Sequence, residues 1–333
     1  MAQAAFDYVA AGAGDELSLE ESRVAWRRHR LRPHAFPGAA VPDLSTDVLG
    51  TSLALPVMVA PTAWQQLAHP AGEVETAAGV SAASGLMVVA TRSTMVIEEI
   101  AAALSGPWWY QVYVVNDRRM TEELVRRAVR LGAKALMLTA DTPYLGFKRR
   151  GNVPPLRFEQ HLANFGAHLE ADAAAELVAH SIDQDSSIGF ETITWLRDLA
   201  GVPVLVKGIL RADDAVACLD AGAAGIVVSN HGGRQLDRAI APAVALPEVV
   251  AAVGDRAPVL VDGGIRSGTD VLVALALGAA ATMVGRPVLW ALAAQGAAGV
   301  QRLLEGFRDE LTHAMGLAGA ANIAGIGRDL VVS

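Results

Sequence analysis

The chain has little cysteine and no long hydrophobic run, and each absence excludes a class of protein. A single cysteine, Cys218, stands among 333 residues, so an internal disulfide and a cysteine-based metal cluster are both excluded. Cys218 lies in a helical pattern over residues 215–219, so we expect a buried thiol. The nearest candidate for a membrane span, over residues 271–284, is shorter than the roughly 18 apolar residues that a span requires. Residues 1–7 lack the basic start of a secretion signal, so we expect a cytoplasmic protein without membrane contact.

Charge of one sign is not concentrated anywhere in the sequence. The 27 basic and 35 acidic residues give a net charge of −8, and no long basic run occurs, so nucleic acid is not expected as a partner. Hydrophobic residues make up 52% of the chain, which is ample for a sizeable core. The length alone permits one large domain or two of average size.

Short apolar runs alternate with helix-period segments along most of the chain. The apolar runs, which predict buried strands, are residues 56–60, 86–90, 108–112, 135–139, 202–206, 225–229, 257–261 and 281–284. The helix-period segments are residues 72–84, 96–104, 118–131, 191–199, 212–221, 243–253, 268–277 and 288 to about 315. Near-continuous apolar strands separated by helices favour a parallel sheet, and eight such units favour a closed (β/α)8 TIM barrel. We therefore predict one α/β domain over residues 1–333, with a short N-terminal helical segment.

The spacing between strands and helices is regular except after the fourth strand. About 60 residues separate Asp141 from Val202, and they contain one confident helix. A loop of this length in a compact domain is usually functional or disordered. We predict an active-site lid over residues 147–187.

Polar residues follow nearly every predicted strand, where the active site of such a barrel lies. The strand ends carry Pro61, Thr62 and Ala63 (first strand), Gln111 and Tyr113 (third), Thr139 and Asp141 (fourth), Lys207 (fifth), Asp262, Gly263, Gly264 and Arg266 (seventh), and Gly285 and Arg286 (eighth). Each of these residues alone has an ordinary structural explanation, such as a cap, a turn or a lysine that reaches solvent. Their joint occurrence at the strand ends favours a site.

The sixth strand ends in the most informative segment, residues 228–237, which reads Val-Ser-Asn-His-Gly-Gly-Arg-Gln-Leu-Asp. A neutral histidine takes a proton near pH 7, and an arginine holds a carboxylate with two parallel hydrogen bonds. His231 and Arg234 around two glycines therefore suit proton removal beside a carboxylate. A lone histidine after a strand is more often structural, so the argument depends on the whole string.

Residues after the last two strands predict a phosphate site. Gly263 and Gly264 expose backbone N–H groups before a helix N-terminus, and Arg266 and Arg286 add positive charge. The alternative is a pair of tight turns with surface arginines. Their position after strands seven and eight favours phosphate.

Residues 228–237 closely resemble the signature of the FMN-dependent α-hydroxy acid oxidase and dehydrogenase family, which includes glycolate oxidase, lactate oxidase, mandelate dehydrogenase and 4-hydroxymandelate oxidase. The resemblance extends from Phe6 to about Met315. It implies FMN as cofactor, with its phosphate in the site predicted above, and Lys207 beside the flavin ring. Further residues implied in flavin binding are Pro61, Thr62, Ala63, Gln111, Thr139, Ser229, Asp262 and Gly285.

The resemblance also implies roles toward the substrate. His231 is the expected base, Asp141 its carboxylate partner, and Arg234 the carboxylate clamp. Tyr113 is expected to hydrogen-bond the substrate hydroxyl or carbonyl group, and Tyr8 to bind its carboxylate.

The sequence departs from the family pattern at three places. The family often has an arginine where this chain has Lys148, so either Lys148 binds the substrate carboxylate or Arg149 replaces it by a local shift. Arg92 stands where glycolate oxidases carry a pocket tryptophan, which makes it a candidate substrate-binding residue and favours a larger or doubly anionic substrate over a small one such as glycolate. Ala90 stands near the place of a serine that binds FMN. The segment before Tyr8 is shorter than usual, which predicts a more open pocket edge.

We therefore expect oxidation of an (S)-2-hydroxy acid to a 2-oxo acid, with electrons passed to O2 to form H2O2 or to another acceptor. The absent tryptophan favours a mandelate- or 4-hydroxymandelate-type substrate over glycolate, and Ala63 matches the alanine common among oxidases. A homo-oligomer, a tetramer or an octamer, is implied by the resemblance alone.

Three alternatives stay open. The first is an FMN-dependent dehydrogenase with a non-oxygen acceptor, the second a flavin-binding barrel with altered or lost activity, and the third another barrel with an FMN phosphate site. Type 2 isopentenyl diphosphate isomerase does not use a His–Arg pair in this way, and inosine monophosphate dehydrogenase needs a loop cysteine, which Cys218 does not provide.

Overall fold

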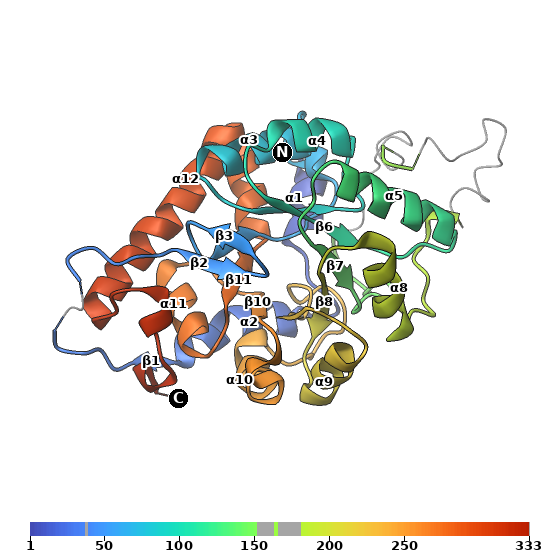
Figure 1. Cartoon of the computed structure of the whole chain (residues 1–333). Helices are drawn as coiled ribbons and strands as arrows, with labels where there is room; N and C mark the ends of the chain where they lie inside the picture. The colour runs from blue at the N-terminus through green and yellow to red at the C-terminus, as the bar shows by residue number, and fades with distance from the viewer. Residues whose placement is uncertain (37–38, 152–162, 166–180, 333) are drawn as a thin grey trace.

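Eight parallel strands form the centre of the molecule (Figure 1). The computed structural model describes residues 1–36, 39–151, 163–165 and 181–332. The strands close into a barrel in the order β10-β11-β4-β5-β6-β7-β8-β9. They are β4 (Val57–Val59), β5 (Met87–Ala90), β6 (Trp108–Val112), β7 (Leu136–Thr139), β8 (Val204–Ile209), β9 (Gly225–Val228), β10 (Val259–Asp262) and β11 (Ala281–Val284). The predicted (β/α)8 barrel is confirmed.

The strands read as continuous apolar runs because both of their faces are buried. Every strand contributes to a compact barrel-interior cluster, which includes Met58, Val88, Trp109, Met137, Leu205, Val227, Leu260 and Met283. Their sequence neighbours, such as Val57, Val89 and Val228, belong to a second, larger cluster shared with the helices. Because side chains alternate across a strand, the first cluster fills the barrel and the second lies between the barrel and its helices.

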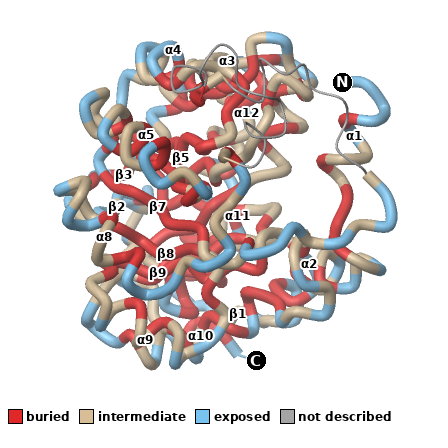
Figure 2. Tube along the Cα trace, turned by 90° about the vertical axis from the view of Figure 1, so that its right-hand side faces the viewer, coloured by how far each residue is buried: buried red, intermediate tan, exposed pale blue. Residues whose placement is uncertain are grey.

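Helices surround the barrel, and their exposed outer turns lie around the buried strands in Figure 2. After the N-terminal helices α1 (Gln3–Ala10) and α2 (Leu17–Arg28), they are α3 (Gly72–Ala82), α4 (Ile97–Ala103), α5 (Arg118–Arg130), α8 (Glu191–Ala200), α9 (Ala212–Asp220), α10 (Pro242–Val253), α11 (Gly268–Ala276) and α12 (Arg286–Ala318). A capping box formed by Ser267 and Asp270 fixes the N-terminus of α11. The path of α12 changes at Gln295 and Gly296, which have non-helical backbone angles.

Two small sheets and helix α2 were not predicted. β2 (Thr46–Val48) and β3 (Thr51–Leu53) form an antiparallel hairpin, and β1 (Arg30–Leu31) pairs with β12 (Val331–Val332). Val48 and Leu53 of the hairpin pack in the barrel-interior cluster, and the indole N–H of Trp109 donates to Thr51 Oγ1 at 3.4 Å. The hairpin therefore covers the amino end of the barrel and leaves the carboxyl end for a site.

The predicted lid over residues 147–187 lies largely outside the described residues. Its described parts are residues 147–151, 163–165 and 181–187. Asn164 accepts a hydrogen bond from the Ile97 N–H at 2.9 Å and donates to the Met95 carbonyl at 3.1 Å, next to the loop after β5. Elsewhere, Cys218 is 2% exposed in α9, as expected. None of the helices described is long and apolar enough to cross a membrane.

Candidate active site

A large cavity lies at the carboxyl ends of the barrel strands. Its volume is about 1280 Å3, above the range of roughly 300–1,000 Å3 that is usual for ligand pockets. The predicted site residues that line it are Tyr8, Pro61, Thr62, Ala63, Arg92, Gln111, Tyr113, Thr139, Lys148, Lys207, His231, Arg234, Asp262, Gly263, Gly264, Arg266, Gly285 and Arg286. Asp141 and Ser229 lie just behind this lining and contact His231 and Lys207. The barrel thus brings residues from distant parts of the sequence to one site.

His231 follows β9 and faces the cavity in an unusual backbone conformation. Its φ is 57°, in the left-handed region that non-glycine residues rarely adopt. Its backbone N–H donates to Ser229 Oγ at 3.0 Å, and its ring Nδ1 lies 3.0 Å from Asp141 Oδ1. Strain of this kind gathers at functional sites and costs on the order of 1–3 kcal/mol. The contacts on both sides of His231 hold the imidazole in a fixed position.

Asp141 reaches His231 across the end of β8, where Gly208 has no side chain. A Cβ added at Gly208 would lie 2.5 Å from both Cβ and Cγ of Asp141, and the φ of Gly208 is +106°. Burial raises the pKa of Asp141, but the charge and hydrogen bond of His231, together with Lys207, hold it below its ordinary value. Asp141 is therefore a carboxylate placed to stabilise a protonated imidazole.

Lys207 is a buried cation at the end of β8, only 4% exposed. Its Nζ lies 2.9 Å from Asp262 Oδ2 and donates to Ser229 Oγ at 2.7 Å. The pairing compensates the cost of burying the lysine. Asp262 Oδ1 is also buried, and it has no hydrogen-bond partner among the described residues. A bound molecule with a hydroxyl or N–H donor would satisfy this oxygen.

A hydrogen-bonded network fixes the floor of the cavity between β5, β6 and β7. The Gln111 amide donates to Thr139 Oγ1 at 3.0 Å and accepts from the Thr91 N–H at 3.1 Å. Thr91 Oγ1 in turn accepts from the Tyr113 N–H at 3.0 Å. Burial, and then the charge of Asp141, raise the pKa of Tyr113, so its phenol stays protonated as a donor. Thr91, which the sequence analysis missed, links Gln111 of β6 with Tyr113 just after the strand.

Arg286 and Arg266 place positive charge beside Gly263 and Gly264. Arg286 donates to the carbonyls of Val9 at 2.9 Å, Ala11 at 3.0 Å and Gly232 at 2.9 Å. Burial, and then the charges of Arg234 and Arg266, lower the pKa of Arg286 to about 9. Crowding of buried guanidinium groups indicates a site for an anion.

Gly263 and Gly264 form a tight turn that packs against α2. Both have positive φ values, +91° at Gly263 and +86° at Gly264. A Cβ on Gly264 would lie 1.7 Å from the Ser22 carbonyl oxygen, so Gly264 permits the close approach of α2. The Gly263 carbonyl accepts from the Trp26 indole at 2.8 Å, which fixes α2 to the same turn.

Two cations lie close to the Tyr8 ring. Lys148 Nζ is 4.9 Å and Arg234 Cζ is 5.0 Å from the ring centroid. Nη1 of Arg234 donates to the carbonyls of Tyr8 at 3.1 Å and Ala11 at 2.8 Å, which docks the end of α1 on the cavity. Burial, and then the charges of Arg234 and Arg286, lower the pKa of Lys148 to about 8. This cluster suits a small carboxylate.

Lys148 and Arg149 point in different directions, which bears on the alternative left open by the sequence. Lys148 lines the cavity, whereas Arg149 pairs with Asp15 at 2.7 Å on the surface, with its side chain 66% exposed. Arg150 pairs with Glu16 at 2.8 Å in the same way. These surface pairs draw Arg149 away from the cavity, so of the two residues it is Lys148 that faces the cavity.

Asn230 is a further residue that the sequence analysis did not single out, although it lies inside the 228–237 segment. Its side chain donates to Ser22 Oγ at 2.8 Å and accepts from the Gly233 N–H at 3.1 Å. It therefore holds the turn that carries His231 and Arg234 against α2. Its position between the two predicted site residues Ser229 and His231 could have identified it from the sequence.

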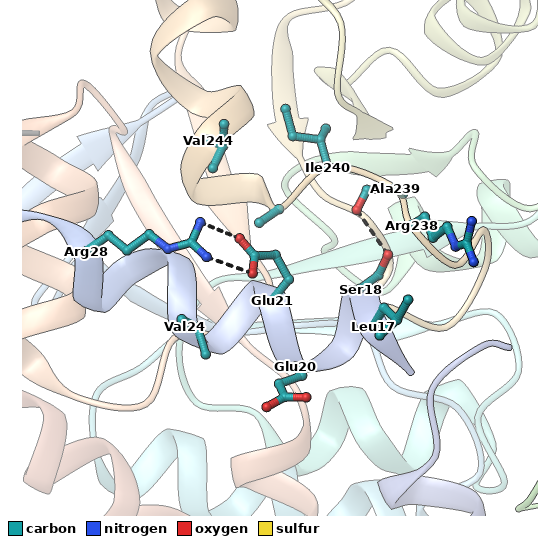
Figure 3. Close-up of a pocket in the computed structure, with 11 residues that line it drawn as sticks. Leu17, Ser18, Glu20, Glu21, Val24, Arg28, Arg238, Ala239, Ile240 and Val244 are labelled. Atoms are coloured by element: carbon teal, nitrogen blue, oxygen red, sulfur yellow. Dashed lines mark hydrogen bonds and ion pairs between the residues drawn. The ribbon is translucent and has the colours of Figure 1, made fainter. Parts of the chain in front are cut away.

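A second hollow, of about 650 Å3, lies between α2 and α10 (Figure 3). Glu21 and Arg28 form an ion pair along α2, and Ser18 Oγ donates to the Ala239 carbonyl at 3.0 Å. None of the predicted site residues lines it. Its contacts hold α2 to the segment that follows the 228–237 turn.

The main cavity fits a phosphorylated flavin. Arg266 and Arg286 supply positive charge for a phosphate, and the unpartnered Asp262 Oδ1 suits a hydroxyl donor of the ribityl chain. Lys207 adds a buried cation, as would suit the flavin ring when it carries negative charge. The volume leaves room for a substrate beside the cofactor.

Comparisons with known proteins agree with this geometry. A family model described as FMN-dependent dehydrogenase matches residues 1–333. The chain is 44% identical over 341 residues to an L-lactate oxidase of Nostoc sp., covering 98% of this chain and 93% of the relative. It is 43% identical over 330 residues to glycolate oxidase 1 of Oryza sativa subsp. indica, covering 97% and 89%.

Solved structures show the same likeness. A mandelate oxidase mutant with (S)-mandelic acid has a TM-score of 0.90 and 40% identity, with 100% of this chain and 94% of that chain covered. A lactate oxidase of Pediococcus acidilactici has a TM-score of 0.91 and 37% identity, with 99% and 90% covered.

Proposed function

The chain belongs to the FMN-dependent dehydrogenase family, and from this premise we propose that it oxidises an (S)-2-hydroxy acid to the corresponding 2-oxo acid. It is an oxidoreductase that acts on CH–OH groups, with FMN as its cofactor. The observation that carries the proposal is the juxtaposition of two groups in one cavity. The His231–Asp141 pair suits proton removal, and the Tyr8–Lys148–Arg234 cluster suits a carboxylate.

The oxidation breaks the O–H and C2–H bonds of the substrate and forms a C=O bond, which releases two electrons and two protons. FMN, when bound, would supply the acceptor for the electron pair together with the C2 hydrogen, as a hydride or its equivalent, and O2, which becomes H2O2, or another acceptor would then reoxidise it. The protein has to orient the substrate, remove the hydroxyl proton and stabilise the charges that develop.

His231 is the base that takes the hydroxyl proton. Its Nδ1 faces Asp141, so its Nε2 is left for the substrate. As the imidazole gains a proton, the Asp141 carboxylate stabilises the positive charge in a buried setting. Base catalysis of this kind contributes typically about 10²- to 10⁴-fold in rate.

The substrate is held at its carboxylate and at its hydroxyl group. Arg234 and Lys148 bind the carboxylate beside Tyr8, and the protonated Tyr113 phenol donates to the substrate oxygen. Lysine is a point charge without the planar fork of arginine, so this clamp relies on Arg234 for orientation.

The proposed substrate is a 2-hydroxy acid with a larger side chain than glycolate. Arg92 lines the cavity, and the family resemblance implies that it stands where glycolate oxidases carry a tryptophan; a mandelate oxidase is among the structural relatives. O2 is proposed as acceptor because the lactate, glycolate and mandelate relatives compared above are oxidases. The resemblance further supports a homo-oligomer, which light scattering on the purified protein would test.

The reaction class is tested by anaerobic mixing of the FMN-loaded protein with a panel of (S)-2-hydroxy acids. Loss of the visible flavin absorbance with at least one of them is expected. Admission of O2 then distinguishes the acceptors: fast recovery of the absorbance with H2O2 formation supports an oxidase. Slow recovery, relieved by an artificial acceptor, supports a dehydrogenase.

A further inference from the structure

We propose that Arg92 recognises a second carboxylate at the far end of the substrate, so that the enzyme prefers 2-hydroxy dicarboxylic acids. This inference rests on the proposed oxidation of 2-hydroxy acids and names the substrate class within it. It makes Arg92 a specificity-determining residue and leaves the base and the first carboxylate clamp as described above.

The backbone that carries Arg92 is firmly held. Arg92 follows β5, its carbonyl accepts from the Trp64 N–H at 3.1 Å, and the preceding Thr91 is tied to Gln111. The buried Glu73 carboxylate accepts from the Thr94 N–H at 3.0 Å and its hydroxyl at 2.7 Å. The Arg92 side chain therefore extends into the cavity from a fixed anchor, as recognition of a specific group requires.

The Arg92 guanidinium lacks a close counter-charge. Its Nη2 donates to the Ile182 carbonyl at 2.8 Å, and no carboxylate of a described residue lies within 4.0 Å of it. Lys207 and His231, by contrast, each have a carboxylate at 2.9–3.0 Å. Burial holds the pKa of Arg92 below its ordinary value, against the opposing effects of Tyr113 and Asp183. A buried cation without a paired anion is costly, and a bound anion removes that cost.

The charge of the cavity also favours a second anion. Among the described residues that line it, six are cations (Arg92, Lys148, Lys207, Arg234, Arg266 and Arg286) and two are carboxylates (Asp183 and Asp262). The phosphate of FMN and one substrate carboxylate neutralise part of this excess and still leave positive charge. A second substrate carboxylate complements the remainder.

The neighbours of Arg92 place it beside the substrate. Arg92, Tyr8 and Tyr113 line the same cavity, and the positive charge of Arg92 opposes the rise that burial causes in the pKa of both tyrosines, which flank the proposed substrate. Guanidinium binds carboxylate with two parallel hydrogen bonds, a geometry that a methyl group in the same place cannot satisfy. A phenyl side chain stacks on a guanidinium but leaves its charge uncompensated.

The test compares substrates that differ only at the far end. (S)-Malate is paired with (S)-2-hydroxybutyrate, and (S)-2-hydroxyglutarate with (S)-2-hydroxyvalerate, while (S)-mandelate represents the aromatic alternative. In anaerobic FMN reduction we expect at least one dicarboxylate to show a half-saturation concentration roughly ten-fold or more below that of its partner, as expected for a charge-assisted hydrogen bond.

Binding without turnover gives an independent readout. Dissociation constants of 2-oxoglutarate and 2-oxovalerate are measured from their perturbation of the FMN spectrum. Arg92→Gln should abolish the preference for the dicarboxylate and retain binding of the monocarboxylate, and Arg92→Lys should keep part of the preference. Arg256→Gln is the matched control, because Arg256 pairs with Asp220 at the opposite end of the barrel.

A preference that is absent in the wild-type enzyme, or that survives in Arg92→Gln, overturns the proposal. So does a clear advantage of (S)-mandelate over both dicarboxylates, because it would assign aromatic stacking to Arg92. If no 2-hydroxy acid reduces FMN, the proposed function fails. The ratio of the dissociation constants of 2-oxovalerate and 2-oxoglutarate still decides whether Arg92 recognises a carboxylate.

Discussion

His231 and Asp141 meet from the ends of two strands that are not neighbours, with Nδ1 of the imidazole 3.0 Å from Oδ1 of the carboxylate. β8 lies between their strands, β9 and β7, and its residue at that level is Gly208. The pair forms because Gly208 has no Cβ. The base, its carboxylate and the glycine between them thus form one structural unit, and each can be tested separately.

Removal of the base should stop flavin reduction without loss of the cofactor. His231→Ala is expected to retain FMN and to lose roughly 10²-fold or more in the rate of reduction by the best substrate. Asp141→Asn should lower the rate as well, because the neutral amide no longer stabilises the imidazolium. Rapid-mixing absorbance at matched FMN occupancy measures both. A near-normal rate in His231→Ala would remove His231 from the role of base.

Gly208→Ala should displace Asp141. The new methyl group would lie 2.5 Å from Asp141 Cβ, and the φ of +106° adds backbone strain on the order of 1–3 kcal/mol. We expect a lower melting temperature together with slower flavin reduction. Gly132→Ala is the control, since Gly132 has a φ of +99° and nothing within 4 Å of an added Cβ. It should lower stability alone, and an equal loss of rate in both variants would contradict the role of Gly208.

The affinity for anionic substrates should fall above about pH 8. Lys148 has a pKa of about 8, below the ordinary value of a lysine, so it is protonated below that pH and neutral above it. A substrate carboxylate binds the protonated form better, so binding takes up a proton at high pH. The dissociation constant of a 2-oxo acid should rise with pH through 8, and Lys148→Arg should flatten this rise. An unchanged profile in Lys148→Arg would assign the titration to another group.

Lys148 and Arg149 should differ in their effect on binding. Lys148 faces Tyr8 in the cavity, and Arg149 pairs with Asp15 outside it. Lys148→Ala should raise the half-saturation concentration of the substrate several-fold, and Arg149→Ala should leave it close to the wild-type value. Both follow from steady-state or anaerobic titrations. A larger effect of Arg149→Ala would show that the loop after β7 rearranges when substrate binds.

Most of the barrel could be predicted because its strands are apolar on both faces. The runs that became β5, β6 and β11 needed no tertiary information to be recognised. β8, at Val204–Ile209, ends later than predicted because Lys207 and Gly208 interrupt the apolar run although they continue the strand. The β2–β3 hairpin has strands of three residues each, too short to show a period.

The site could be predicted as a set of residues and less well as a set of contacts. Strand-end residues such as Lys207 and Asp262 were identified because the barrel places the ends of its strands together. The pairing of Arg286 with the Val9 carbonyl joins residues that are 277 positions apart, and nothing local to either residue indicates it. The direction of Arg149 likewise depends on Asp15, which the sequence does not place beside it.

The most direct test of the account is a single anaerobic turnover with product analysis. The FMN-loaded protein is mixed with excess of the best (S)-2-hydroxy acid, and the bleached flavin and the 2-oxo acid are both quantified. The account predicts one 2-oxo acid formed for each FMN bleached, and neither signal on the same timescale with His231→Ala. Bound FMN that no 2-hydroxy acid bleaches, or bleaching without formation of a 2-oxo acid, would contradict it.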